Sequence, residues 1–428
     1  MGVRLAAVLM ILVAAIAAAP VALAAPQAVT VGLYFGDNAP KSVTLGGAGD
    51  WKARKDHGHY TGVYRVRVSG GEIEIAKPGD GSGKIGRWVD LTPAAKNSGL
   101  ALDGRTYRGL IKIEAQPDGG LKVTNKLEME DYLQGVIPNE MFSIPGALDA
   151  LKVQAVISRT LAMFIKTTQP RHEGQGFDVC ATGHCQFYRG LTSETNTGNE
   201  AVKRTRGEIL TYQGKAILAA YHANAGGYTA PTDEAWPGSL RVRYLTPVRS
   251  PYDDFASQLN YSDCFQWRET IRPEQIRERV RSLTGKDPGE VRDIIVARSD
   301  SDRVKELRVI GSLREVGVTG PQRIRTALGL VGEATGKSYD HDLRLVTIER
   351  NGDRFSITGY GAGEGVGLSQ HGAIGMARAG FTYPEILGHY YRGVSLSENY
   401  GAGDSTYLRA PDLRVRAQSP KAKPTEPG

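Results

Sequence analysis

The sequence predicts an α+β fold, in which mixed β-rich segments surround a buried central helix and carry an inserted α/β subdomain. Three observations support this fold class. Strand and turn patterns fill the chain to about residue 125, an almost wholly apolar helical pattern spans 147–165, and short strands alternate with charged helices from about 250 to 340. The length of 428 residues is sufficient for two or three domains.

We expect six segments along the chain. They are a signal peptide at 1–24, a β-rich region at 25–104, a first core segment at 105–250, an inserted α+β subdomain at 251–340, a second core segment with a glycine-rich loop at 341–400, and a basic, proline-rich tail at 401–428.

The first residues have the layout of a secretory signal peptide. One early cation, Arg4, precedes a long apolar stretch that ends in the small-residue pattern Ala22-Leu23-Ala24. The apolar stretch also approaches the length of an uncleaved membrane anchor. Pro20 and the Ala-x-Ala ending favour cleavage near Ala24. We therefore expect an exported protein of the cell envelope.

The charge balance indicates an anionic partner. The net charge is +7 and the sequence pI is about 9.1, which suits nucleic acid, anionic lipid or an acidic cell-wall polymer. Export argues against nucleic acid. Charged residues are 23% and hydrophobic residues 40% of the chain, a composition typical of globular proteins.

The central helix is predicted after a short helical turn at 126–136. Ser143 can cap this helix and Pro145 can occupy its first turn. The residues at 147–165 are apolar almost all round, which indicates burial. Lys152 and Arg159 are the exceptions, and their spacing of seven places them on one face. Such cations either extend to a surface or face an aqueous cleft.

The stretch RHEGQGFDVCATGHCQFYRG contains four side chains of the kind that bind metals. They are His172, Cys180, His184 and Cys185. Two thiolates and two imidazoles match a closed tetrahedral zinc site, which would be structural because no position remains open for water. A Cys180–Cys185 disulfide is also natural in an exported protein, and free thiols are the third alternative.

Two further stretches contain candidate ligand-binding residues. The glycines of GYGAGEGVGLSQHG lack the spacing of either common phosphate-binding loop. They allow the backbone to approach a ligand or a packed helix closely, and the helix that follows could bind an oxygen-rich ligand at its start. YHANAGGYT combines groups suited to sugar hydroxyls. The candidate substrate-binding residues are Tyr221, His222, Gly226, Gly227, Thr229, Ser369 and Gln370.

A single carboxylate in the stretch GVIPNEMF, Glu140, lies between apolar segments. It is either a solvated turn residue or a catalytic acid whose pKa is raised by burial. A conventional glycosidase needs two carboxylates. One glutamate is sufficient for a lytic transglycosylase, because the 6-hydroxyl of the sugar itself attacks and no enzymic nucleophile is required.

Together these motifs resemble the SpoIID/LytB proteins. The matching stretches run in order from about 105 to 396 and are LEMEDYLQGVIPNEM, ALDALKVQAVISRT, HCQFYRG, AYHANAGGYT and GVGLSQHGAIGMARAGFTYPEILGHYYRGVSL. The resemblance implies that 105–250 and 341–400 form the catalytic core of a peptidoglycan lytic transglycosylase. Such an enzyme cuts glycan strands, peptide-stripped in sporulation members, to leave 1,6-anhydro-N-acetylmuramic acid ends.

The resemblance also implies roles for particular residues. The acid of the family's Glu-Met motif falls on Glu140, and its helix cations fall on Lys152 and Arg159, which would line the cleft. Some members carry zinc on a His/Cys cluster, which favours zinc at 172–185.

The glycine-rich loop departs from the family pattern. Where the family usually shows Gly-Trp-Gly-His-Gly-Val-Gly, Ala362 and Glu364 replace an aromatic and an imidazole group. This departure brings the preference for a particular glycan into question. It also supports an alternative function, a non-catalytic peptidoglycan-binding module that recruits or enhances a cell-wall amidase.

Overall fold

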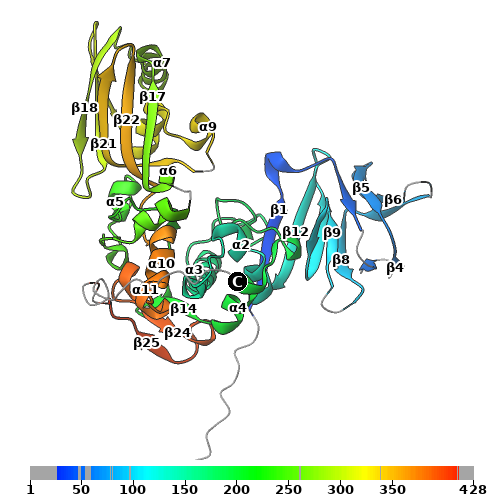
Figure 1. The fold of residues 1–428 in the computed structure, drawn as a ribbon. Helices are drawn as coiled ribbons and strands as arrows, with labels where there is room; N and C mark the ends of the chain where they lie inside the picture. The colour runs from blue at the N-terminus through cyan, green and yellow to red at the C-terminus, as the bar shows by residue number, and fades with distance from the viewer. Residues whose placement is uncertain are drawn as a thin grey trace, which may run out of the picture.

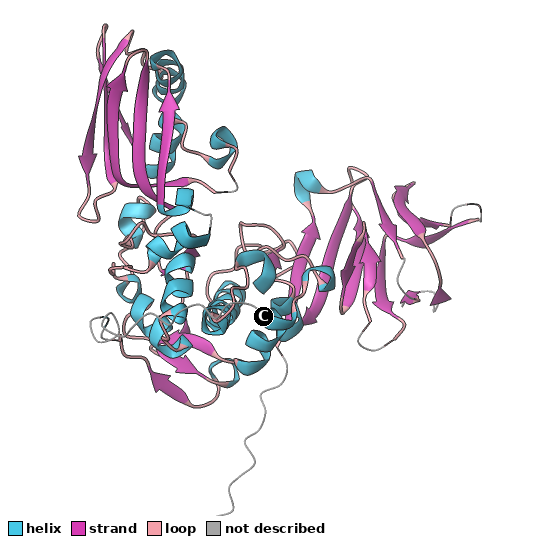
Figure 2. Cartoon of the chain, in the orientation of Figure 1, coloured by secondary structure: helices cyan, strands magenta, loops and turns pink. Residues whose placement is uncertain are grey.

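The computed structural model describes residues 27–413, apart from 47–49, 54–58, 78, 80, 96–97, 260–261, 338 and 412. The predicted signal peptide and the tail after 413 lie outside the described residues. Strands make up nearly all of the regular structure up to Glu128, and helices and strands are mixed after it, which confirms the α+β class (Figure 2). No helix within these ranges combines the length and apolar character needed to cross a membrane.

Two sheets form the N-terminal part of the fold (Figure 1). The first has the strand order β13-β1-β12-β11-β8-β3-β4, with bounds Val179–Cys180, Ala28–Tyr34, Leu121–Glu128, Leu110–Ala115, Trp88–Pro93, Trp51–Ala53 and His59–Tyr60. The second has the order β10-β9-β2-β5-β6-β7, with bounds Arg105–Tyr107, Leu100–Leu102, Ser42–Leu45, Tyr64–Ser69, Glu72–Ala76 and Ser82–Gly86. Their buried residues belong to one apolar cluster that also includes the central helix.

The pairing of β11 with β12 confirms the hairpin that the turn residues QPDGGL indicate. The same sheet takes strands from both sides of residue 104, since β8 pairs with β11. The expected boundary at 104/105 therefore does not separate two independent sheets.

The central helix, α3, spans Leu148–Thr167 and is buried on nearly all sides, as its apolar pattern predicts. It begins later than expected: the residue before it, Ala147, provides no side-chain cap, and Ser143 lies outside the helix. Around α3 pack helices with the bounds α1 Met129–Gln134, α2 Ile137–Glu140, α4 Asn196–Arg204, α10 Gln370–Arg378 and α11 Tyr383–Tyr390.

The inserted subdomain has an apolar core of its own. Its sheets have the orders β17-β22-β21 and β18-β19-β20, with bounds Gln266–Ile271, Arg354–Ala362, His341–Asn351, Val291–Arg298, Val304–Gly311 and Glu315–Thr319. Its helices are α7 Pro273–Thr284, α8 Pro321–Leu328 and α9 Gly332–Thr335. The hairpin β21–β22 contributes Leu343, Val346, Phe355 and Ile357 to this core, so residues beyond the expected end at 340 pack with the subdomain. Figure 1 shows it on the opposite side of the helical centre from the N-terminal sheets.

The chain then returns to the central part. Strand β23 (Leu368–Ser369) pairs in parallel with β16 (Tyr221–His222). A four-stranded sheet has the order β15-β14-β24-β25, with bounds Lys215–Ala216, Ile209–Tyr212, Ser395–Ser397 and Ser405–Tyr407. Strand β25 lies in the segment expected to form the tail, so regular structure continues past residue 400. Two further short α-helices are α5 Thr232–Ala235 and α6 Ser262–Phe265.

Candidate active site

Glu140 is the last residue of α2, and its carboxyl group receives two hydrogen bonds. The backbone N–H of Phe187 donates to Oε1 at 2.7 Å, and the Tyr221 hydroxyl donates to the same carboxyl group. Burial raises the pKa of Glu140, and the two hydrogen bonds lower it less than burial raises it. A carboxyl group of raised pKa can hold its proton nearer to neutral pH, which is what a general acid requires.

The buried amide group of Gln186 orients the Tyr221 hydroxyl toward this carboxyl group. The Tyr132 hydroxyl donates to Oε1 of Gln186 at 3.2 Å. The Nε2 group of Gln186 in turn donates to the Tyr221 hydroxyl oxygen at 3.4 Å. Because that oxygen accepts from Gln186, its own proton can point toward Glu140.

Gln370 connects the start of α10 to the same place. Its Nε2 group donates to the backbone carbonyl of Glu140 at 2.8 Å and to Oε1 of Gln154 at 3.2 Å. Gln154 lies on α3 and donates in turn to Ser158 at 3.1 Å. The structure therefore brings together three of the predicted site residues, Glu140, Tyr221 and Gln370.

Within the described residues, no second carboxyl group is hydrogen-bonded to Glu140 or to the groups that contact it, Phe187, Tyr221 and Gln370. The groups that shift its pKa are Phe187 and Tyr221, with no second acid among them. Glu130, the acid that α1 buries, is engaged elsewhere. The geometry thus suits a reaction that one carboxyl group can carry.

Arg159 does not line an open cleft, contrary to the expectation from the family resemblance. Its side chain is fully buried and forms a two-point ion pair with Glu130, with Nε–Oε1 at 2.8 Å and Nη2–Oε2 at 2.7 Å. Nη1 donates to the carbonyl of Glu208, and the Tyr400 hydroxyl donates to Glu130. Burial alone would raise the pKa of Glu130, but the charge and hydrogen bonds of Arg159, the Tyr400 hydroxyl and the N–H of Gly207 lower it overall. Arg159 is therefore paired with Glu130, a residue 29 positions away in the chain, inside the core.

Lys152 also has partners other than Glu140. Its Nζ lies 3.4 Å from Oδ1 of Asp149 and 5.4 Å from the centre of the Tyr383 ring. The side chain is 14% exposed. Neither of the two predicted cations therefore contacts the candidate acid.

His222 and Thr229 are buried and bonded within the protein. Nδ1 of His222 donates to the carbonyl of Val366 at 3.0 Å, and burial lowers the pKa of this imidazole to about 4. The Thr229 hydroxyl accepts from the N–H of Val248 at 2.8 Å. Both residues are almost inaccessible to solvent, at 5% and 2% exposed, and their role as substrate contacts stays a prediction.

Hydrogen bonds within the protein also engage three other candidate residues, Ser369, Gly226 and Gly227. The Ser369 hydroxyl donates to Oδ1 of Asp253 at 2.5 Å and caps α10. The N–H of Gly227 donates to Oδ2 of Asp253 at 2.8 Å, and the N–H of Gly226 donates to Oδ1 of Asn224 at 2.8 Å. These bonds join the three candidate residues to Asp253 and Asn224 inside the fold, and their role as substrate contacts stays a prediction.

The buried Asp253 predicts a dependence of stability on pH. Burial raises its pKa from 3.8 to about 6 in the folded chain. The folded state then holds a proton that the unfolded state has released, so the stabilisation is complete below the lower value and is lost as pH rises through the higher one. About two pKa units correspond to roughly 3 kcal/mol. Urea unfolding of wild type and Asp253→Asn should show their stability difference changing by about this amount between about pH 4 and pH 7. An unchanged difference would contradict it.

The two residues that depart from the family pattern contact the inserted subdomain or its boundary. Glu364 forms an ion pair with Nη1 of Arg325 from α8 at 3.1 Å. Arg325 also donates to the carbonyls of Gly363 and His341 at 3.1 and 2.8 Å. Ala362 is fully buried at the end of β22. Glu364 thus has a structural partner in this chain.

Two more arginines of the subdomain bind the loop that follows Tyr221. Arg303 is paired with Asp342 at 2.6 Å and donates to the carbonyl of Tyr228 at 3.0 Å. Arg344 donates to the carbonyl of Gly226 at 2.5 Å. The subdomain therefore positions both loops that lead to the site.

The four candidate metal ligands lie together. One ligand atom from each of His172, Cys180, His184 and Cys185 lies within 4.8 Å of all the others, and the two thiols are not joined in a disulfide. Nε2 of His172 is 3.3 Å from Sγ of Cys185, and Nδ1 of His184 is 3.6 Å from Sγ of Cys180. Ligand atoms around a tetrahedral zinc, with bonds of about 2.0–2.3 Å, lie roughly 3.3–3.8 Å apart. The donor set and spacing therefore fit a zinc ion.

This cluster adjoins the candidate acid through the chain itself. Cys185 is followed directly by Gln186, which orients Tyr221, and by Phe187, which donates to Glu140. A metal ion bound to Cys185 would therefore also restrain Gln186 and Phe187, which follow it in the chain. Sequence reasoning missed Gln186, Phe187 and Gln154. The stretch HCQFYRG contains Gln186 and Phe187 and matches the family pattern, but the residues that these two contact lie far away in the sequence.

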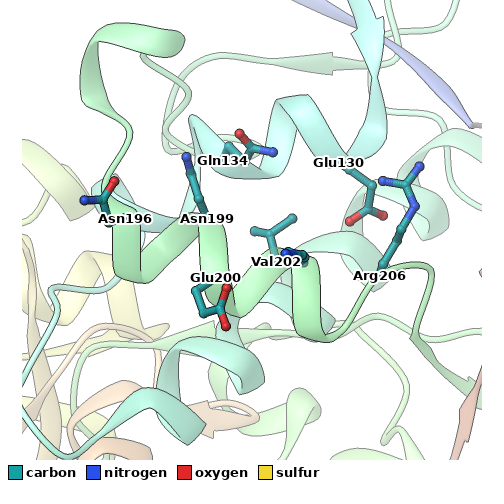
Figure 3. A pocket seen from close by; sticks show the side chains of 8 residues that line it. Glu130, Gln134, Asn196, Asn199, Glu200, Val202 and Arg206 are labelled. Atoms are coloured by element: carbon teal, nitrogen blue, oxygen red, sulfur yellow. The ribbon is translucent and has the colours of Figure 1, made fainter.

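A cavity of about 310 Å³ lies between α1 and α4 (Figure 3). Its lining residues are Glu130, Gln134, Asn196, Asn199, Glu200, Val202, Lys203 and Arg206. Glu140 is not among them, so this cavity does not mark the candidate acid. It lies beside the buried pair of Glu130 with Arg159.

Two family models match the chain. One, described as a stage II sporulation protein, matches residues 117–212, which include Glu140 and the four candidate metal ligands. The other, described as a domain of unknown function, matches residues 252–367 and covers the inserted subdomain.

Curated relatives match over more of the chain. The amidase enhancer of Bacillus subtilis is 29% identical over 380 residues, which are 78% of this chain and 50% of that protein. The stage II sporulation protein D of the same organism is 30% identical over 286 residues, 64% of this chain and 75% of that protein. An uncharacterized protein of Brachyspira hyodysenteriae is 30% identical over 309 residues, 70% and 74% of the two chains. The match thus spans half the length of the amidase enhancer.

Proposed function

This chain belongs to the SpoIID/LytB family, and from that premise we propose that it acts in the bacterial cell wall as an exported lytic transglycosylase. Its substrate is the glycan strand of peptidoglycan, stripped of peptides. The relatives named for sporulation and for amidase enhancement support the cell-wall role. The observation that carries the enzymatic proposal is the single, partly buried Glu140 carboxyl group with its raised pKa.

In the proposed reaction, Glu140 first acts as the general acid. It gives its proton to the oxygen that joins C1 of N-acetylmuramic acid to C4 of N-acetylglucosamine, and the C1–O bond breaks. The resulting carboxylate then takes the proton of the 6-hydroxyl of the same N-acetylmuramic acid, while that oxygen bonds to C1. Glu140 ends protonated, as it began, and no water is consumed.

Phe187 and Tyr221 would stabilise Glu140 during this reaction. Both donate hydrogen bonds to the Glu140 carboxyl group, and such donors stabilise the carboxylate that forms when the proton leaves. Gln370 holds the backbone of Glu140 in place. The net charge of +7 suits a glycan whose lactyl carboxylates are free.

The product identifies the reaction class. Peptide-free glycan strands are digested with the mature protein and the fragments are analysed by mass spectrometry. Anhydro ends are expected. Reducing ends would mean a hydrolase and a second carboxylate, and intact strands after digestion with well-folded, metal-replete protein would contradict the proposal.

We also propose that zinc is bound by His172, Cys180, His184 and Cys185. A closed four-ligand zinc supplies folding energy and does not act on substrate. The cluster would then fix Gln186 and Phe187 against the acid.

Metal analysis of the purified protein should find about one zinc per chain. A strong chelator should lower the melting temperature, because the binding free energy of a structural zinc is folding free energy. Cys180→Ser should lose the metal, and Cys264→Ser is the matched control, since Cys264 is also buried and free but lies outside the cluster. Equal zinc content in both variants would argue against the assignment.

A non-catalytic module that recruits or enhances a cell-wall amidase is the second candidate. The relative named amidase enhancer favours it, as does the loss of the family's imidazole at Glu364. It predicts glycan or amidase binding without cleavage and no effect of Glu140→Gln.

A further inference from the structure

Phe187 contacts the candidate acid through its backbone and carries a large, exposed aromatic side chain. Its own N–H donates to Glu140 at 2.7 Å, yet its side chain is 44% exposed. Its neighbours Gln186 and Tyr188 are only 1% and 2% exposed. The aromatic ring therefore projects outward from a backbone whose next side chains on both sides are anchored inside.

Those anchors fix the direction of the ring. Gln186 bonds to Tyr132 and Tyr221, and the Tyr188 hydroxyl donates to Oδ1 of Asn125 at 2.8 Å. With residues 186 and 188 held inside, residue 187 must face away from the core. These two anchors therefore expose the ring of a residue whose backbone N–H contacts the acid.

The ring of Phe187 packs over Gly183. A Cβ atom at Gly183 would lie 3.0 Å from Cζ and 3.3 Å from Cε2 of Phe187. A side chain at position 183 would therefore crowd the ring, which now lies over the glycine. The ring therefore rests on the loop backbone with part of its surface open to solvent.

From this placement we propose that Phe187 is a stacking platform for one pyranose ring of the glycan bound at Glu140. The inference rests on the proposed function and names a residue that recognises the same substrate class, a β-1,4-linked strand of N-acetylated amino sugars. Pyranose rings present an apolar face of C–H groups, which the negative face of an aromatic ring attracts. Stacking there would hold the scissile bond within reach of the acid.

The test measures binding apart from cleavage. All proteins carry Glu140→Gln, and their affinity for peptide-free glycan fragments is measured by calorimetry. Phe187→Ala should weaken binding roughly tenfold, the size expected for loss of one aromatic contact, whereas Phe187→Trp should keep it. Both variants retain the N–H that bonds to residue 140. Trp88→Ala is the matched control, because Trp88 is 41% exposed on β8.

In the active protein, Phe187→Ala should raise KM more than it lowers kcat, which a loss of folding would not do. Equal affinity of Phe187→Ala and its parent would overturn the platform while leaving the proposed function standing. An equal loss in Trp88→Ala would also overturn it. No binding by any protein, including the parent, would overturn both proposals.

Discussion

Glu140→Gln should abolish glycan cleavage and leave the fold intact. The amide has the shape of the carboxyl group and its oxygen can still accept the N–H of Phe187, but it has no proton to transfer at the pH of the reaction. Loss of a general acid costs about 10²–10⁴ in rate, and loss of the base in the second step adds to it. Product formation is followed by mass spectrometry, with melting temperature as the measure of folding.

Glu200→Gln is the matched control for this experiment. Glu200 lies on α4 and forms an ion pair with Arg204 at the surface, so its loss should leave activity unchanged. Activity of Glu140→Gln equal to wild type would remove the single-carboxylate mechanism and favour the binding module.

The same mechanism sets the direction of the pH dependence. The first step needs the protonated acid, so the rate should fall as pH rises through the pKa of Glu140. Because burial raises this pKa, the fall should occur at a higher pH than for an ordinary glutamate.

Arg159→Met should destabilise the protein by about 3–5 kcal/mol, because it leaves Glu130 charged and buried without its partner. The pair is inaccessible to solvent on the arginine side and 5% exposed on the glutamate side. Such a loss is a large part of the free energy of unfolding of an ordinary domain. Urea unfolding measures the effect.

Lys152→Met is the control on the same helix. Lys152 is partly exposed and its ion pair with Asp149 spans 3.4 Å, so the change should cost no more than about 1 kcal/mol. The family resemblance makes a different prediction, a folded Arg159→Met protein with little activity. That outcome would support the role of Arg159 in catalysis that the family resemblance implies.

Local patterns in the sequence determine several features of this protein. The apolar run at 147–165 is sufficient to predict a buried helix, because no face of it can remain in water. The turn residues between β11 and β12 predict a hairpin through their conformational preferences. The cluster of four candidate metal ligands is also local, since they lie within 172–185 and a short loop can bring them together.

Tertiary structure alone decides which groups meet at the acid. Glu140 and Phe187 are 47 residues apart, and Gln370 is 230 residues from the carbonyl that it contacts. Arg159 shows the same limit: its spacing from Lys152 predicts a shared face, but the partner that it finds is Glu130 on another helix. Patterns of charged and apolar residues predict which side of a helix or strand is buried. The packing of elements that are distant in the sequence decides which group each buried polar side chain contacts.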